Sequence, residues 1–167
     1  CRFASDSGAF YTGRDWGYRG NQLRFNFFHD IIGLDSSTYV QGIYIDDAAS
    51  GFEVYGNIFY NIAGYCTMDS GGRDNIFTNN IFVKCNSATE TDRRAMTAAN
   101  NITGDSWNFL ERLSKAAKWK EDPWKTRYPL LYAIPNNWQQ VLMGNWRNPE
   151  GAVFSCNIGW KNTAWMT

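Results

Sequence analysis

A short block that recurs along the chain limits the possible folds more than any other feature of this sequence. Each copy places an asparagine among apolar or aromatic residues, and the copies span residues 23–28, 54–59, 77–82 and 155–159. The asparagines are Asn26, Asn57, Asn80 and Asn157, separated by 31, 23 and 77 residues. A step in the low twenties is typical of one turn of a parallel β-helix, so the longer steps predict turns with loop insertions.

An aspartate stands eleven residues before each of the first three asparagines. These aspartates are Asp15, Asp46 and Asp69, and they align residues 9–15 with residues 40–46 and 63–69. Each aligned block is short, partly aromatic or β-branched and contains glycine, which favours a strand. Stacked turns place equivalent residues roughly 4.8 Å apart, so we expect Asp46 beside Asp69. The asparagines themselves have a structural explanation, since asparagine tolerates left-handed backbone and can form side-chain ladders.

Residues 88–150 interrupt the repeat. Within them, residues 107–119 have helical propensity, with apolar side chains at Leu110, Leu113 and Ala117. Three prolines then punctuate an irregular, aromatic stretch. An insertion of this length is more often a functional wall than an idle loop.

The repeat therefore predicts an all-β fold, a segment of a right-handed parallel β-helix, or solenoid. We expect β-helix turns in residues 1–87, a partly helical, tryptophan-rich insertion in residues 88–150, and a return to the β-helix in residues 151–167. Terminal turns of a solenoid need caps with a polar outer surface. Neither end of this sequence resembles a cap, so we expect the chain to contact the remainder of a longer chain or neighbouring subunits.

Charge and hydropathy exclude two classes of partner. The chain has sixteen basic and sixteen acidic residues, whereas a nucleic-acid-binding surface needs a positive excess. Its longest apolar runs are only a few residues, far short of the roughly 20 that cross a bilayer. The four cysteines, Cys1, Cys66, Cys85 and Cys156, have no CxxC spacing, which disfavours a zinc site. They permit either two disulfides or free buried thiols.

Four stretches resemble the right-handed β-helix proteins grouped with glycoside hydrolase family 141, which includes fucosidase and xylanase activities. They are residues 6–16, residues 42–47, residues 71–75 with 79–82, and residues 123–129. The resemblance implies a pectate lyase-like fold, glycan hydrolysis, and an extracellular or periplasmic location. It also implies that Asp6 and Asp47 match the catalytic acidic pair. Two departures are Arg94 after Asp92-Arg93, where glycine is expected, and Asp69-Ser70, where small residues or histidine are expected.

Cleavage of a glycosidic bond needs one carboxylic acid and one carboxylate, and we predict that Asp6 and Asp47 supply them. Carboxylates on adjacent strands would repel and raise the pKa of at least one. Tryptophan rings suit the C–H faces of sugars, and arginines bind hydroxyl or acidic groups. The predicted substrate-binding residues are Arg14, Asp46, Asp69, Arg73, Asp92, Arg93, Trp107 and Trp124.

Several interpretations stay open at this point. Aspartates that cap turns or hold a structural Ca²⁺ are the structural alternative, which we favour for Asp15 and Asp74. No other cofactor is expected. His29, next to Asp30, is either a catalytic acid or structural. A polysaccharide lyase could use Arg73 as its base with Ca²⁺, and a non-catalytic β-helix could bind glycans or build an extracellular assembly.

Overall fold

The computed structural model describes residues 4–35, 39–97 and 104–167, and its strands form three parallel sheets within these ranges. The five-stranded sheet has the order β1 (Ser7–Gly13), β4 (Val40–Asp46), β7 (Tyr65–Ser70), β10 (Ser87–Asp92) and β13 (Ala164–Met166). The second sheet has the order β11 (Val153–Ser155), β8 (Ile76–Thr78), β5 (Phe52–Tyr55) and β2 (Asn21–Arg24). The third has the order β12 (Ile158–Trp160), β9 (Ile81–Val83), β6 (Ile58–Ile62) and β3 (Phe27–Ile31).

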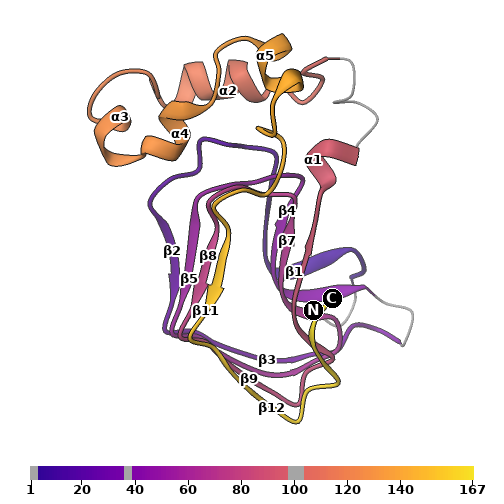
Figure 1. The fold of residues 1–167 in the computed structure, drawn as a ribbon. Helices are drawn as coiled ribbons and strands as arrows, with labels where there is room; N and C mark the ends of the chain where they lie inside the picture. Colours follow the sequence, from indigo (N-terminus) through magenta and orange to yellow (C-terminus); the bar gives the residue numbers. More distant parts are fainter. Residues whose placement is uncertain (1–3, 36–38, 98–103) are drawn as a thin grey trace.

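The chain visits the three sheets in rotation. Strands β4, β5 and β6 enter the five-stranded, second and third sheets in turn, and β7, β8 and β9 repeat this order. Figure 1 shows the equivalent strands of successive passes side by side. The fold is thus mostly β, which confirms the predicted class.

The strand register in the five-stranded sheet differs from the predicted one. Asp46 pairs with Gly13 rather than with Asp15, and Asp69 pairs with Ile45 rather than with Asp46. The constant spacing of eleven residues misled the alignment, because paired strand positions do not lie at a constant distance from the asparagines: Gly13 precedes Asn26 by 13 residues whereas its partner Asp46 precedes Asn57 by 11, and Ile45 precedes Asn57 by 12 whereas its partner Asp69 precedes Asn80 by 11. A shift of one residue turns a side chain to the other face of a sheet. Asp69 therefore points inward with Ile45, whereas Asp46 points outward.

The asparagines of the repeat form the expected side-chain ladder. Nδ2 of Asn26 donates to Oδ1 of Asn57 at 2.9 Å, Asn57 donates in the same way to Asn80 at 3.1 Å, and Asn80 to Asn157 at 3.1 Å. Each acceptor oxygen also receives the backbone N–H of the preceding asparagine, at 2.8 to 3.0 Å. Because Asn57 and Asn80 are fully buried, the ladder satisfies polar groups where water cannot reach them.

We expect Asn57→Ala to lower the free energy of unfolding by about 3 kcal/mol. The Asn57 side chain makes four hydrogen bonds, two from Asn26, one to Asn80 and one to the carbonyl oxygen of Leu23, and each contributes about 0.5–1.5 kcal/mol net. Denaturant unfolding measures the loss. Asn26→Ala is the matched control, since Asn26 is exposed at the end of the ladder and should cost about 1 kcal/mol. Equal losses in the two variants would contradict a buried ladder.

Aromatic rings stack through the core enclosed by the sheets. The ring of Phe59 lies 5.0 Å from that of Phe28 and 5.1 Å from that of Phe82, and Phe82 lies 5.9 Å from Phe154. Phe28, Phe59 and Phe82 occupy equivalent positions of the repeat and stack from one pass of the chain to the next, whereas Phe154 comes from the second sheet, since glycine stands at the position that pairs with Phe82. The same core holds Cys66 and Cys85 as free thiols.

Free Cys156, by contrast, is exposed, and Cys1 lies outside the described residues. The interpretation of the cysteines as free buried thiols therefore applies to Cys66 and Cys85.

The insertion folds into short helices that pack on a second core. They are α1 (Arg94–Thr97), α2 (Phe109–Ala116), α3 (Trp124–Arg127), α4 (Pro129–Ala133) and α5 (Trp138–Met143). Trp16, which follows β1 and is fully buried, stacks on Phe109 with 4.4 Å between the ring centroids. Figure 1 shows α2 to α5 together at one end of the sheets.

The start of the insertion lies later than the expected residue 88. Strand β10 continues to Asp92 because its backbone pairs with β7, although its polar sequence has no strong β propensity. None of the helices in the described ranges is long and apolar enough to cross a membrane.

Candidate active site

The outer face of the five-stranded sheet gathers carboxyl groups from several passes of the chain. Because side chains alternate along a strand, the register places Tyr11, Tyr44, Met68 and Glu90 across this face. A second row, one step further along the strands, brings Asp46, Ser70 and Asp92 to the same face. We call the carboxyl groups of this region the acidic face: Asp6, Asp46, Asp47, Glu90 and Asp92.

Asp46 lies at the end of β4 with most of its surface buried. Its Oδ2 accepts a hydrogen bond from the Tyr11 hydroxyl at 2.9 Å, and its Oδ1 accepts one from the backbone N–H of Asp47 at 2.7 Å. Burial raises the pKa of Asp46, and the nearby Asp47 raises it further, against the lowering effect of the Tyr11 hydrogen bond. Burial and the same hydrogen bond raise the pKa of Tyr11 to about 12. Asp46 is therefore a carboxyl group that retains its proton more readily than an exposed aspartate.

Asp47 has the opposite environment, because two arginines hold it. Oδ2 accepts a hydrogen bond from Nε of Arg14 at 2.6 Å, and Oδ1 accepts one from Nε of Arg94 at 3.0 Å. The Asp47 side chain is only 4 % exposed, whereas the side chains of Arg14 and Arg94 are 55 % and 51 % exposed, so water reaches the ion pairs from the arginine side. Asp47 has a positive φ of 46°, a conformation that aspartate tolerates better than most residues.

Arg94 and Trp107 complete this end of the face. Arg94 begins α1, where its backbone N–H donates to Oδ1 of Asp92 at 2.8 Å. The guanidinium of Arg14 lies 5.3 Å from the centre of the Trp107 ring, so the predicted Trp107 does stand next to the predicted Arg14. Sequence reasoning noted Arg94 only as a departure from glycine and missed its ion pair with Asp47.

Asp6 lies on the same face but at the other end of the strands. It precedes β1, is exposed, and its Oδ1 accepts a hydrogen bond from the Tyr44 hydroxyl at 3.4 Å. Gly13, seven residues after Asp6, pairs with Asp46. At about 3.3 Å per residue, roughly 20 Å of extended strand lies between Asp6 and the Asp46-Asp47 end. The structure thus places Asp6 and Asp47 on one face without bringing them into contact.

Glu90 is a member of the acidic face that sequence reasoning missed. Burial, and then repulsion from Asp92, raises the pKa of Glu90 to about 7. Its Oε2 is buried and has no hydrogen-bond partner among the described residues. Asp92 accepts a hydrogen bond from the Ser70 hydroxyl at 3.0 Å, which links β10 to β7. Had residues 87–92 been recognised as a strand, the alternation of their side chains would have placed Glu90 and Asp92 on the same face.

Two predicted site residues lie inside the molecule. Oδ1 of Asp69 accepts hydrogen bonds from the Asn75 side chain at 2.9 Å and from the Gly72 backbone at 3.0 Å, and burial raises the pKa of Asp69 to about 7. Arg73 is 2 % exposed and donates to the carbonyl oxygen of Trp146 at 2.8 Å. The lyase interpretation needs Arg73 as a base, whereas its guanidinium donates to the Trp146 carbonyl and pairs with Glu150, and these contacts give that interpretation no support.

The remaining predicted residues divide between structural and exposed positions. Trp124 packs against Tyr128 in the insertion, with 5.4 Å between ring centroids, while Arg93 is exposed next to Arg94. Asp15 caps a turn through the Gly17 N–H at 2.6 Å.

Asp74 forms an ion pair with Arg19 at 2.7 Å. Asp15 therefore caps a turn, as in the interpretation that we favoured, whereas Asp74 is held by an arginine side chain instead of a backbone amide.

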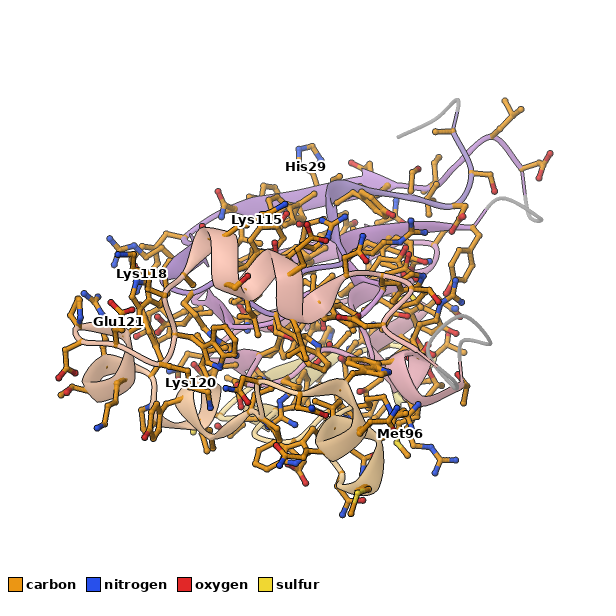
Figure 2. The ribbon with its side chains drawn as sticks, turned by 90° about the horizontal axis from the view of Figure 1, so that it is seen from above. His29, Met96, Lys115, Lys118, Lys120 and Glu121 are labelled. Carbon is orange, nitrogen blue, oxygen red and sulfur yellow. The ribbon has the colours of Figure 1, made fainter. Side chains whose placement is uncertain are left out.

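His29 lies far from the acidic face. Figure 2 shows it on the opposite side of the view from Met96 of α1, the helix that begins at Arg94. In the part of the chain that the structure describes, no three His, Cys, Asp or Glu side chains are arranged to hold a metal ion, and Ca²⁺ stays an untested prediction. No known family profile matches the chain, and no curated protein or solved structure matches it either.

Proposed function

We propose that the chain is a segment of a right-handed parallel β-helix that hydrolyses glycosidic bonds on its acidic face, outside the cell or in the periplasm. The rotation of the chain through three parallel sheets supports the β-helix, as does the asparagine ladder that crosses four passes. Connections between parallel strands are nearly always right-handed. The resemblance of four stretches to glycoside hydrolase family 141 supports the choice of substrate class.

The observation that carries this proposal is the contrast between Asp46 and Asp47. Burial raises the pKa of Asp46, whereas Asp47 is paired with two guanidinium groups. Two adjacent carboxyl groups with opposite environments suit an acid and a base. Asp46 donates its proton to the oxygen that leaves as the C–O bond breaks, and Asp47 attacks the anomeric carbon or takes a proton from the attacking water.

Asp6 then binds the glycan at a distance from the bond that breaks. Roughly 20 Å of extended backbone separates the strand positions of Asp6 and Asp46. Asp46 and Asp47 are adjacent in the chain, so we assign to them the two carboxyl groups that cleavage needs. A glycan that lies along the strands would reach both Asp6 and Asp47, with Tyr44 between them. The exposed ring of Tyr11 and the ring of Trp107 offer surfaces for sugar C–H groups.

The charge of the acidic face is close to balanced. Arg14 and Arg94 form ion pairs with Asp47, and burial raises the pKa of Asp46 and of Glu90, so both keep a proton more readily than exposed carboxyl groups do. A balanced face suits a neutral polysaccharide, because hydroxyl groups can donate to carboxylates and accept from guanidinium groups.

Digestion of a panel of neutral and acidic polysaccharides tests the proposed reaction. We expect new reducing ends, product masses that include one added water per cleavage, and no ultraviolet absorbance from a new double bond. The double variant Asp46→Asn/Asp47→Asn controls for a contaminating enzyme and should release nothing. Unsaturated, ultraviolet-absorbing products would establish a lyase instead, and glycan binding without new reducing ends would establish a non-catalytic protein.

A further inference from the structure

A cavity lies on a different side of the molecule from the acidic face. It has a volume of about 400 Å³, within the range of small-molecule sites, and lies between strands β2, β5 and β8 and helices α3 and α4. Figure 1 places α3 and α4 above β2, and α1, with Arg94, above the five-stranded sheet. We propose that this cavity binds a neutral sugar ring through the Arg19–Asp74 pair. The choice of a sugar rests on the lining of the cavity and is independent of the proposed hydrolysis.

The polar part of the lining has unused hydrogen-bonding capacity. Nη2 of Arg19 donates to Oδ2 of Asp74 at 2.7 Å, and the Arg19 side chain is 3 % exposed. Nε of Arg19 and Oδ1 of Asp74 are buried and have no partner among the described residues. Buried polar groups in proteins are nearly always hydrogen-bonded. Both atoms are enclosed in the free chain. A hydroxyl group is both donor and acceptor, so sugar hydroxyls accept from Nε and donate to Oδ1 once the lining shifts to admit them.

The rest of the lining suits the apolar face of a sugar. Phe52 and Ile76 line the cavity from the sheet, and Tyr128, Leu130 and Leu131 line it from the insertion. Apolar and aromatic side chains pack against sugar C–H groups. Such walls with a few polar groups that fix orientation are the usual design of a small-molecule site.

The charges around the cavity cancel, which selects a neutral ligand. Arg19 and Arg127 supply two positive charges, and Asp74 and Glu53 supply two negative charges. At the entrance, the Gln22 amide donates to the Glu53 carboxylate at 2.7 Å in an exposed position. A ligand with a net charge would face a like charge wherever it bound, whereas hydroxyl groups can bond to all of these side chains.

Glycines next to the ion pair let Arg19 and Tyr128 pack closely against the backbone. Gly51 has a φ of 84°, and a Cβ there would lie 2.3 Å from Nη1 of Arg19. Gly20 has a φ of 79°, and a Cβ there would lie 3.2 Å from the hydroxyl oxygen of Tyr128. Glycine is the residue that adopts this left-handed conformation without strain, so Gly51 permits the close approach that holds the Arg19 guanidinium beside the cavity.

Titration of the ¹⁵N-labelled chain with methyl glycosides tests the proposal. The neutral probes are methyl β-glucopyranoside, methyl β-galactopyranoside and methyl α-mannopyranoside, and the charged probes are methyl β-glucuronide and glucosamine. We expect amide shift changes at residues 19–22, 52–53, 127–128 and 130–131 with at least one neutral probe. Both charged probes should bind at least tenfold more weakly.

Variants locate the binding. Leu130→Trp fills the cavity from the exposed surface of α4 and should weaken binding at least tenfold, whereas Met143→Trp, on the exposed surface of α5, should leave it unchanged. Asp47→Asn should also leave it unchanged, which separates this site from the acidic face. The proposal is overturned if no neutral probe shifts these amides, if a charged probe binds more tightly, or if Leu130→Trp binds as the unmodified chain does.

Discussion

Replacing either Asp46 or Asp47 with asparagine should lower kcat for glycan hydrolysis by roughly 10²–10⁴-fold, the usual contribution of a catalytic acid or base. Asparagine keeps the size of the side chain but can neither donate the proton that Asp46 holds nor carry the charge that Arg14 and Arg94 bind at Asp47. Initial rates of reducing-end release measure the loss. Asp46→Asn should also remove the decline of kcat/KM on the alkaline side of the pH profile, because that decline reports deprotonation of the acid.

Two further variants make this prediction specific. Glu121→Gln is the matched control, since Glu121 is exposed at the far side of the insertion, as Figure 2 shows, and should keep full activity. Asp6→Asn should raise KM more than it lowers kcat, because Asp6 is assigned to binding. If instead Asp6→Asn abolishes turnover and Asp46→Asn does not, Asp6 is the acid and the assignment of Asp46 is wrong.

Asp69→Asn should flatten the pH dependence of stability. Burial raises the pKa of Asp69 from 3.8 to about 7, so between about pH 4 and pH 7 the folded chain keeps a proton that the unfolded chain has lost. The free energy of unfolding then falls as pH rises, by up to about 1.4 kcal/mol per pH unit for this group. The contribution of Asp69 to the free energy of unfolding is fully present below pH 4 and is lost as the pH rises through 7, a total of about 4 kcal/mol.

Denaturant unfolding at several pH values gives the free energy of unfolding as a function of pH. The effect of Asp69 is the difference between the slopes for the unmodified chain and for Asp69→Asn. Asp46, Asp74 and Glu90 also have raised pKa values, so the unmodified chain should retain part of its slope when Asp69 is replaced. Glu121→Gln should leave the slope as it is. Parallel curves for Asp69→Asn and the unmodified chain would show that Asp69 is ionised in the folded state.

The asparagine block was enough to predict the mostly β class and the ladder. A ladder requires only that equivalent residues recur once per pass of the chain, and the spacing of Asn57 and Asn80 records that recurrence. These features depend on residue type and period, and both can be read along the chain. Arg14 and Trp107 were each predicted to bind substrate, but that they lie beside each other was seen only in the structure.

The strand register and the composition of the acidic face depended on three-dimensional information. Asp69 points inward because it pairs with Ile45, one residue away from the alignment with Asp46 that the asparagine spacing predicted, and the sequence around the aspartates carries no sign of that shift. Glu90 lies on the acidic face because the polar segment β10 pairs with β7. Strand propensity alone does not indicate this pairing.

The repeat by itself determined the mostly β class and the asparagine ladder, because both arise from interactions between equivalent positions. The tertiary structure alone decided which carboxyl groups are buried, which are paired with arginines and which share a face. Arg94 reaches Asp47 across 47 residues, and Arg19 reaches Asp74 across 55. The charge state of a carboxyl group depends on such neighbours and on its exposure to water, and both are properties of the folded chain.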